Sequence, residues 1–258
     1  MNIQGQAAIV TGGASGLGAQ TARELAKRGA KVAVFDRNAE GAKAVAAEIG
    51  GIGVGCDITS SDSVIKALNA AREAHGPARI LMNIAGIGTA KRLIGKDGTP
   101  MPLEDFRRVI EVNLIGTFNV TRLAVAEMVK LDPLKDDANS GERGVVVNTA
   151  SVAAFDGQVG QEAYAASKGG VVSLTLPLAR DLAQFGVRVV TIAPGLFLTP
   201  LMAELPLPVQ ESLAASIPFP KRLGKPEEFA HLAATIVENL ALNGEVIRLD
   251  GALRMAPR

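Results

Sequence analysis

The sequence predicts one doubly wound α/β domain over residues 1–258, with a seven-stranded parallel sheet flanked by helices. Short runs rich in β-branched residues alternate with amphipathic stretches, which is the pattern of successive βαβ units. A content of 48% hydrophobic residues, with 28 Gly and 13 Pro among 258 residues, suits one globular domain with a large core. We expect the strands at residues 7–10, 31–35, 53–56, 80–83, 145–149, 188–192 and 246–249.

Charge and cysteine content narrow the partners that we expect. The 27 Lys and Arg residues balance 26 Asp and Glu residues without a block of like charge, which argues against nucleic acid and membrane partners and favours a small molecule. No apolar run approaches the length of a bilayer span, and the first residues do not resemble a targeting peptide. The single cysteine, Cys56, excludes an internal disulfide and is interpreted as core packing at a strand end. We therefore expect a cytoplasmic protein, and no metal site because the two histidines are isolated.

The loop after the first strand is rich in glycine. Its sequence over residues 11–18, Thr-Gly-Gly-Ala-Ser-Gly-Leu-Gly, leads into an amphipathic helix. Glycines allow a tight turn and let the backbone approach a pyrophosphate, whose charge lies at the helix N-terminus. This context favours the dinucleotide site of a Rossmann fold over a merely structural turn. The cofactor residues predicted here are Gly12, Ser15, Gly16, Leu17 and Gly18.

Asp36 bears on the choice of cofactor. It ends the second strand, eighteen residues after Gly18, where a carboxylate accepts hydrogen bonds from a ribose 2′-hydroxyl. Its charge would also repel a 2′-phosphate. The adjacent Arg37 weakens this argument, but Ala14 and Ser15 add no cation in the loop. The sequence thus favours NAD over NADP.

Polar and small residues follow the third and fourth strands. Asp57, with Ile58 behind it, lies within reach of an adenine edge, although an N-terminal cap for the next helix is the alternative. After the fourth strand, Asn83, Ala85 and Gly86 would let a ribose pack against the backbone. All five residues are assigned to the cofactor site.

Tyr164 and Lys168 are spaced so that they share one helix face. A nearby cation favours the phenolate of a Tyr, whose free pKa is about 10, and a Tyr so tuned exchanges a proton with an alcohol. Ser151 follows the strand at residues 145–149, where its hydroxyl could meet Tyr164 in one cleft. Asn113 lies in a long helical pattern where Asn is a weak helix former, which indicates a role, although a satisfied buried amide is the commoner explanation. A Tyr-x-x-x-Lys motif alone also fits a solvated helix face.

In order along the whole chain, these motifs resemble the short-chain dehydrogenase/reductase family, with Ala-Pro-Gly at residues 193–195 as a further match. The resemblance implies that Tyr164 is the general acid/base and that Lys168 lowers its pKa and binds the nicotinamide ribose. It also implies that Ser151 holds the substrate oxygen and that Asn113 anchors a proton-relay water. Ile84 departs from the family, in which a second Asn is common there. The further cofactor residues that the family implies are Pro194, Gly195, Phe197 and Thr199.

Outside those motifs, the chain is more closely similar to the type II 3-hydroxyacyl-CoA dehydrogenases, also called 17β-hydroxysteroid dehydrogenase type 10. The similar stretches are residues 149–155, 157–161, 193–197, 218–220, 222–224 and 243–251. This similarity implies an NAD-dependent interconversion of 3-hydroxyacyl-CoA and 3-oxoacyl-CoA by a homotetramer.

Three alternatives stay open. A 3-oxoacyl-carrier-protein reductase of the same fold should prefer NADPH, and a hydroxysteroid or polyol dehydrogenase would use the same chemistry on another alcohol. A catalytically silent dinucleotide-binding scaffold comes from a different class. Such a scaffold would not need all four residues of the proposed catalytic set, which are Ser151, Tyr164, Lys168 and Asn113.

Three segments carry expectations of their own. Five prolines between residues 200 and 220, among Leu, Met and Phe, predict an apolar flap over a pocket, with an ordinary packed loop as the alternative. Residues 91–100 and 132–143 are predicted surface loops. The last strand should form the sheet edge, and the apolar residues after it predict a subunit interface at residues 243–255, unless the tail folds back on its own domain.

Overall fold

The computed structural model describes residues 1–88, 90–135 and 140–257. Within these residues, seven parallel strands form one sheet in the order β3-β2-β1-β4-β5-β6-β7. Every predicted strand is confirmed, with bounds that differ by at most two residues; Cys56 follows its strand. The strands are β1 (Ala7–Thr11), β2 (Lys31–Asp36), β3 (Ile52–Gly55), β4 (Ile80–Asn83), β5 (Gly144–Thr149), β6 (Val187–Pro194) and β7 (Val246–Leu249).

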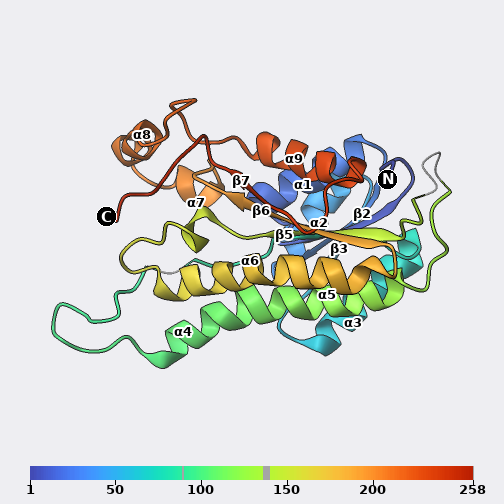
Figure 1. The fold of residues 1–258 in the computed structure, drawn as a ribbon, viewed down its shortest axis with the longest axis horizontal. Coiled ribbons are helices and arrows are strands. Elements are labelled where there is room, and N and C mark those ends of the chain that lie inside the picture. The colour runs from blue at the N-terminus through green and yellow to red at the C-terminus, as the bar shows by residue number, and fades with distance from the viewer. Residues whose placement is uncertain (89, 136–139, 258) are drawn as a thin grey trace.

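Helices cover both faces of the sheet (Figure 1). One core contains side chains from α1 (Gly16–Lys27), α2 (Ala39–Glu48) and α9 (Pro226–Glu238). The opposite core contains side chains from α3 (Ser61–His75), α5 (Thr117–Met128) and α6 (Glu162–Ala183). Shorter helices complete the fold: α4 (Leu103–Ile110), the π-helical η1 (Glu111–Gly116), the 3₁₀-helical η2 (Val152–Ala154), α7 (Pro200–Ala203) and α8 (Leu207–Ala215). This is the doubly wound Rossmann arrangement that the sequence predicts.

Strand β5 shows why the central strands appear in the sequence as continuous apolar runs rather than as alternating apolar and polar residues. All of its residues are buried. Val145 and Val147 pack into one core, and Val146 packs into the other. Because a parallel sheet is covered by helices on both faces, successive side chains of such a strand are buried on opposite faces and are mostly apolar. The edge strand β7, by contrast, is only half-buried.

The helices α4, η1 and α5 form one continuous rod, Leu103–Met128, whose apolar part has a mean hydropathy of 1.3. By length and composition this rod could cross a membrane, so the expectation that no apolar run approaches that length is wrong. Half of its apolar window is buried inside the fold. A helix that covers a sheet face needs the same long apolar surface, because it packs along the whole length of the strands.

The C-terminal tail folds back onto its own domain. Strand β7 lies at the sheet edge, as predicted. However, Leu253 is only 2% exposed, and the Val159 amide donates to the carbonyl of Pro257 at 3.1 Å. The prediction that the apolar residues after β7 lie uncovered is therefore wrong for Leu253. Of the predicted surface loops, residues 91–100 are exposed, whereas the second loop is described only in part because residues 136–139 lie outside the described ranges.

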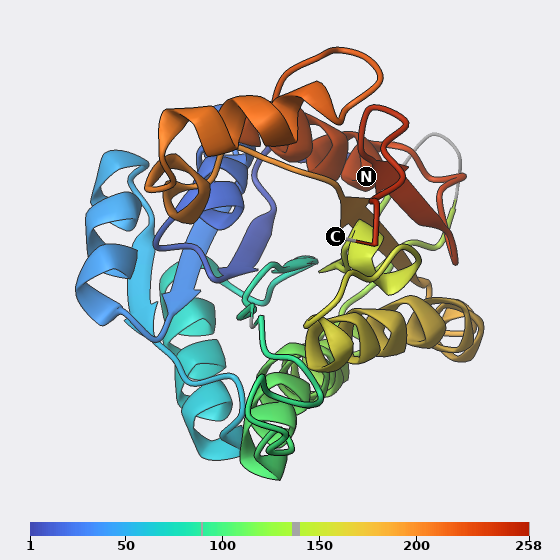
Figure 2. The same ribbon diagram turned by 90° about the vertical axis from the view of Figure 1, so that its left-hand side faces the viewer.

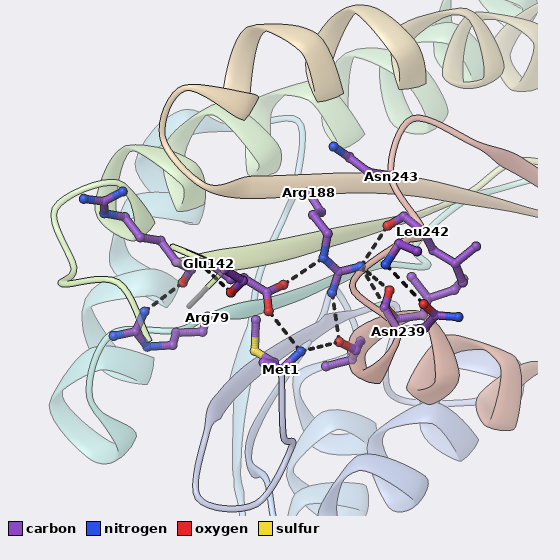
Figure 3. Close-up of polar contacts among 12 residues, drawn as sticks. Met1, Arg79, Glu142, Arg188, Asn239, Leu242 and Asn243 are labelled. Carbon is purple, nitrogen blue, oxygen red and sulfur yellow. Dashed lines mark hydrogen bonds and ion pairs between the residues drawn. The ribbon is translucent and has the colours of Figure 1, made fainter. Parts of the chain in front are cut away.

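A buried arginine joins the sheet to the end of α9 (Figure 3). Arg188, on β6, donates through Nε to Glu142 at 2.8 Å, and Glu142 also lies 2.9 Å from the amino group of Met1. The guanidinium donates to four backbone carbonyls at 2.8–3.1 Å, those of Ile236, Val237, Asn239 and Leu242. The last carbonyls of a helix lack intrahelical partners, so Arg188 supplies the donors that the end of α9 needs.

We expect Arg188→Met to lower the free energy of unfolding by about 3–5 kcal/mol, because it leaves buried carbonyls and part of a buried carboxylate without donors. Urea unfolding at neutral pH measures this change. Arg72→Met is the matched control: Arg72 pairs with Glu127 on the surface, and such pairs contribute at most about 1 kcal/mol. An Arg188→Met variant as stable as this control contradicts the role of the network.

Candidate active site

A cleft of about 540 Å³ opens where the carboxyl ends of β1, β4, β5 and β6 meet. Ligands of doubly wound sheets bind at this edge. The structure brings most of the predicted site residues to its walls. These are Gly12, Ser15, Gly16, Leu17, Gly18, Asp36, Ala85, Gly86, Ser151, Tyr164, Lys168, Pro194, Gly195, Phe197 and Thr199.

A smaller cavity of about 260 Å³ shares Asp36 and Gly86 with the cleft and contains Asp57 and Ile58. Asp57 accepts hydrogen bonds from the amide and hydroxyl of Thr59 at 2.9 and 2.7 Å, and these bonds hold the pKa of the carboxyl below its usual value. The alternative role of Asp57 as a helix cap is wrong, since Ser60 caps α3.

The glycine-rich loop packs directly against the chain after β4. A Cβ atom on Gly12, whose φ is +67°, would lie 2.7 Å from the backbone N and Cα of Ala85. A Cβ atom on Gly18 would lie 2.1 Å from the carbonyl oxygen of Gly12. Side chains do not fit at either position. The first turn of α1 consequently faces the cleft, where its free amide groups favour an anion.

Asp36 is held in place by the backbone on either side of it. Its carboxylate accepts from the amide of Ala14 at 3.1 Å and from the amide of Asn38 at 2.9 Å. A carboxylate has about four acceptor positions, so Asp36 keeps acceptors free toward the cleft. Arg37 and Arg108 also line the smaller cavity.

Ser151, Tyr164 and Lys168 meet at the opposite wall of the cleft. Ser151 follows β5 and caps η2, accepting from the amide of Ala153 at 3.1 Å. Lys168 Nζ lies 5.9 Å from the centroid of the Tyr164 ring, so the two side chains share one face of α6 as predicted. The ammonium donates to the carbonyl of Thr149, at the end of β5, at 2.8 Å.

Burial is the main influence on the pKa values of Tyr164 and Lys168. Burial raises the pKa of Tyr164, and its hydrogen bond with Ser151 lowers that pKa in part. Burial also lowers the pKa of Lys168 to about 8. The expected lowering of the Tyr164 pKa by Lys168 is therefore not seen here, because desolvation of the phenolate has the largest effect on that pKa.

Asn113 behaves as a satisfied buried amide. It is fully buried in the π-helical η1, and its side chain exchanges hydrogen bonds of 2.8 Å with both backbone groups of Ile87. Its amide also donates to Ser167 at 3.0 Å. Short π-helical segments are rare and occur mostly at functional sites. Asn113 thereby fixes the segment after β4 that lines the cleft, and a catalytic role for it stays a prediction.

Asn83 points into the core rather than into the cleft. Its amide nitrogen donates to Thr121 and to Asn148, both at 2.9 Å, and the residue is 3% exposed. Asn83 lines neither cavity. We therefore correct its assignment to the cofactor site: its side chain joins β4 to β5 and α5, while the backbone after it forms the wall.

The structure adds residues that the sequence motifs do not mark. Cys56, assigned to the core, lines the smaller cavity, and burial raises the pKa of its thiol to about 11. Arg108 reaches that cavity from α4, and no motif signals it. The remaining residues of the two cavities are Phe35, Arg37, Ile84, Ile87, Gly88, Val112, Thr149, Ala150, Leu196, Pro200 and Met202.

The predicted apolar flap is present in part. Helix α7 contributes Pro200 and Met202 to the cleft. Helix α8 has no buried residue and exposes Leu207 and Val209. Among the described residues, no group of three or more His, Cys, Asp or Glu side chains is arranged to hold a metal ion.

Three comparisons agree with this geometry. The short chain dehydrogenase family pattern matches residues 6–209. The 3-hydroxyacyl-CoA dehydrogenase type-2 of Homo sapiens is 51% identical over 259 residues, which cover 99% of this chain and 98% of that protein. The crystal structure of 3-hydroxyacyl-CoA dehydrogenase type-2 from Mycobacterium avium is 46% identical, with a TM-score of 0.94 over 98% of each chain.

A third similar protein is a 3-ketoacyl-(acyl-carrier-protein) reductase from Brucella melitensis, whose crystal structure is complexed with NADH. It is 33% identical, with a TM-score of 0.85 over 98% of this chain and 100% of its own. The chain therefore belongs to the short-chain dehydrogenase/reductase family, and it is a short-chain dehydrogenase.

Proposed function

We propose that this protein uses NAD to interconvert 3-hydroxyacyl-CoA and 3-oxoacyl-CoA. The observation that carries the proposal is the 51% identity, over nearly the whole chain, to a relative named for this reaction. The gathering of Ser151, Tyr164 and Lys168 in one cleft supports it. We also propose that the enzyme is a homotetramer, in line with the exposed apolar side chains of the α4–α5 rod, which include Leu103 and Phe118. We propose a cytoplasmic location because the single cysteine, Cys56, fits a reducing compartment. Sedimentation velocity tests the oligomeric state.

The residues of the cleft fit an NAD molecule. The close approach of Gly12 to the β4 end leaves backbone rather than side chains on the cleft floor, as a pyrophosphate requires. Amide groups at the start of α1 would bind that pyrophosphate. Asp36, with its orientation fixed by two backbone amides, would accept hydrogen bonds from the adenosine ribose. When bound, NAD supplies the hydride chemistry by exchanging a hydride with the carbinol carbon of the substrate.

The side chains of the protein handle the proton. In the oxidising direction Tyr164 accepts the proton of the substrate hydroxyl, and in the reducing direction it returns a proton to the carbonyl oxygen. Ser151, hydrogen-bonded to the phenol, would also contact that oxygen and orient it. Lys168 has a pKa of about 8 and is held by Thr149, so its charge near the site depends on pH in the neutral to mildly alkaline range.

Two alternatives of the same family remain to be separated by experiment. A carrier-protein reductase with a preference for NADPH is disfavoured by the carboxylate of Asp36. A polyol dehydrogenase is disfavoured by apolar side chains in the cleft, which include Leu196, Phe197 and Met202. Oxidation of NADH and of NADPH, measured side by side with acetoacetyl-CoA, a ketosteroid and a ketose, discriminates among them. Turnover of the ketose alone would overturn the proposal.

We expect Tyr164→Phe to reduce turnover by about 10²- to 10⁴-fold, because Phe keeps the ring and removes only the proton donor. The NADH dissociation constant, measured by fluorescence titration, should stay unchanged. Lys168→Ala should weaken both turnover and NADH binding, since Lys168 is proposed to serve the phenol and the ribose. Turnover like that of the wild type in Tyr164→Phe contradicts the catalytic assignment.

We expect the wild-type enzyme to prefer NAD to NADP in kcat/KM, and Asp36→Ala to narrow that preference. Charge-assisted hydrogen bonds of this kind contribute about 1.5–3 kcal/mol, which corresponds to a loss of about 10- to 100-fold in kcat/KM for NAD. Repulsion of the 2′-phosphate also disappears. Asp62→Ala, which removes a carboxylate from the first turn of α3 outside both cavities, is the matched control. An NADP-specific wild-type enzyme would show that the interpretation of Asp36 is wrong.

A further inference from the structure

Seven residues join the two sides of the proposed catalytic wall. This linking segment, residues 155–161, runs from η2, which Ser151 caps, to α6, which carries Tyr164. Its own secondary structure is limited to turns. The linking segment therefore connects the part of the chain that carries Ser151 to the helix that carries Tyr164.

Arg248, on β7, binds the linking segment through a bidentate ion pair with Asp156. Its Nη2 lies 2.5 Å from Oδ2 of Asp156, and its Nη1 lies 3.3 Å from Oδ1 of the same carboxylate. The guanidinium carbon is 5.2 Å from the centroid of the Phe155 ring. The side chains of Arg248 and Asp156 are 20% and 16% exposed. This degree of burial makes the pair stronger than an ordinary surface ion pair.

The same guanidinium binds the C-terminal tail. Arg248 donates to the carbonyl of Leu253 at 2.9 Å. Residues 253–257, here called the terminal strap, then continue along the linking segment: Gln158 donates to the carbonyl of Ala256 at 2.9 Å, and the Val159 amide donates to Pro257. Figure 2 shows the red C-terminal end beside the yellow-green chain that contains η2. The linking segment is thus held by Arg248 at one point and by the terminal strap at two more.

A further contact connects Arg248 to the opposite wall of the cleft. Its Nε donates to Asp250 at 2.8 Å. Asp250 packs on Gly195, where a Cβ atom would lie 2.8 Å from the Asp250 Cβ. The amide of Gly195 also donates to the carbonyl of Leu249 at 2.9 Å. One side chain therefore contacts the linking segment, the terminal strap and the residue that supports the cofactor wall.

The chemistry of these contacts requires arginine. The planar guanidinium presents five donors in a fixed fork, so it serves two carboxylates and a carbonyl at once, whereas the ammonium of lysine is a point charge with three donors. The hydrogen bond with Arg248 holds the pKa of Asp156 below its usual value. Asp156 is thus charged at neutral pH and available to this pair.

We propose that Arg248 is a positioning residue of the reaction: through Asp156 and the terminal strap it fixes the linking segment, and so sets the alignment of Ser151 with Tyr164. Arg248 is not among the residues that line the cleft or the smaller cavity. Its effect on turnover rests on the function proposed above, while its effect on the linking segment does not.

The test compares Arg248→Met, Arg248→Lys and Asp156→Asn with the wild-type enzyme. We expect Arg248→Met to lower kcat/KM for acetoacetyl-CoA by about 10- to 100-fold, with an unchanged NADH dissociation constant. The kcat/KM of Arg248→Lys should lie between those of the wild type and of Arg248→Met, because lysine keeps the positive charge but lacks the planar guanidinium. Asp156→Asn should lower kcat/KM in the same direction but by less than Arg248→Met, because Arg248 then keeps its contact with the terminal strap. The double variant should be no slower than Arg248→Met, as expected if Asp156 acts through Arg248.

Hydrogen exchange supplies a readout that does not depend on the substrate. The amides of residues 155–161 should exchange faster in Arg248→Met and Asp156→Asn, and Arg72→Met, which breaks the distant surface pair with Glu127, should leave both exchange and kcat/KM unchanged. Wild-type exchange together with wild-type kcat/KM in either variant overturns the proposal. If Arg248→Met does not fold, Arg248→Lys and Asp156→Asn decide by the same measurements. Faster exchange in variants of an enzyme that is inactive on acetoacetyl-CoA supports the positioning role and contradicts the proposed substrate.

Discussion

The site depends on one steric constraint, the contact between the glycine-rich loop after β1 and the backbone that follows β4. Because β1 and β4 are neighbours in the sheet, their carboxyl ends meet, and Gly12 lies where a Cβ atom would touch Ala85 at 2.7 Å. Thr11 strengthens this contact, since its hydroxyl accepts from the amide of Ala85 at 3.3 Å. The chain then continues through Gly86, where a Cβ atom would lie 3.3 Å from Lys168 Nζ. The glycine-rich floor of the cleft and the wall that carries Lys168 are thereby joined through the segment after β4.

Desolvation of the buried Lys168 ammonium is the second physical constraint on the site, and it lowers the stability of the fold. Lys168 is 4% exposed and its pKa is lowered to about 8 by burial. A lysine whose folded-state pKa lies below its ordinary value of 10.5 costs stability while it is charged. That cost is fully present below about pH 8 and disappears as the pH rises through 10.5. Functional sites commonly retain such costs, which packing elsewhere offsets. The buried ammonium of Lys168, 5.9 Å from the centroid of the Tyr164 ring, carries a cost of this kind.

The sequence predicted features that follow from periodicity and from fixed spacing. The buried valines of β5 mark a strand, and the i, i+4 spacing of Tyr164 and Lys168 places both on one face of α6. Features that depend on packing between distant segments could not be predicted. Asn83 turns into the core because its partners come from α5 and β5, and the raised pKa of Tyr164 follows from its burial. Leu253 is covered because the tail turns back, which no local pattern of apolar residues reveals.

Two arginines on neighbouring strands show how similar interactions serve different ends. Arg188 lies on β6 and saturates carbonyls at the end of α9, so its partners are parts of the core that form only when the fold forms. Arg248 lies on the edge strand β7 and binds Asp156, which belongs to a segment of turns with little apolar burial. Segments of this kind open with small free energies while the core stays folded. Loss of an interaction in the core therefore lowers the free energy of unfolding of the whole protein. Loss of an interaction that holds a weakly packed segment instead lowers the local order of the site.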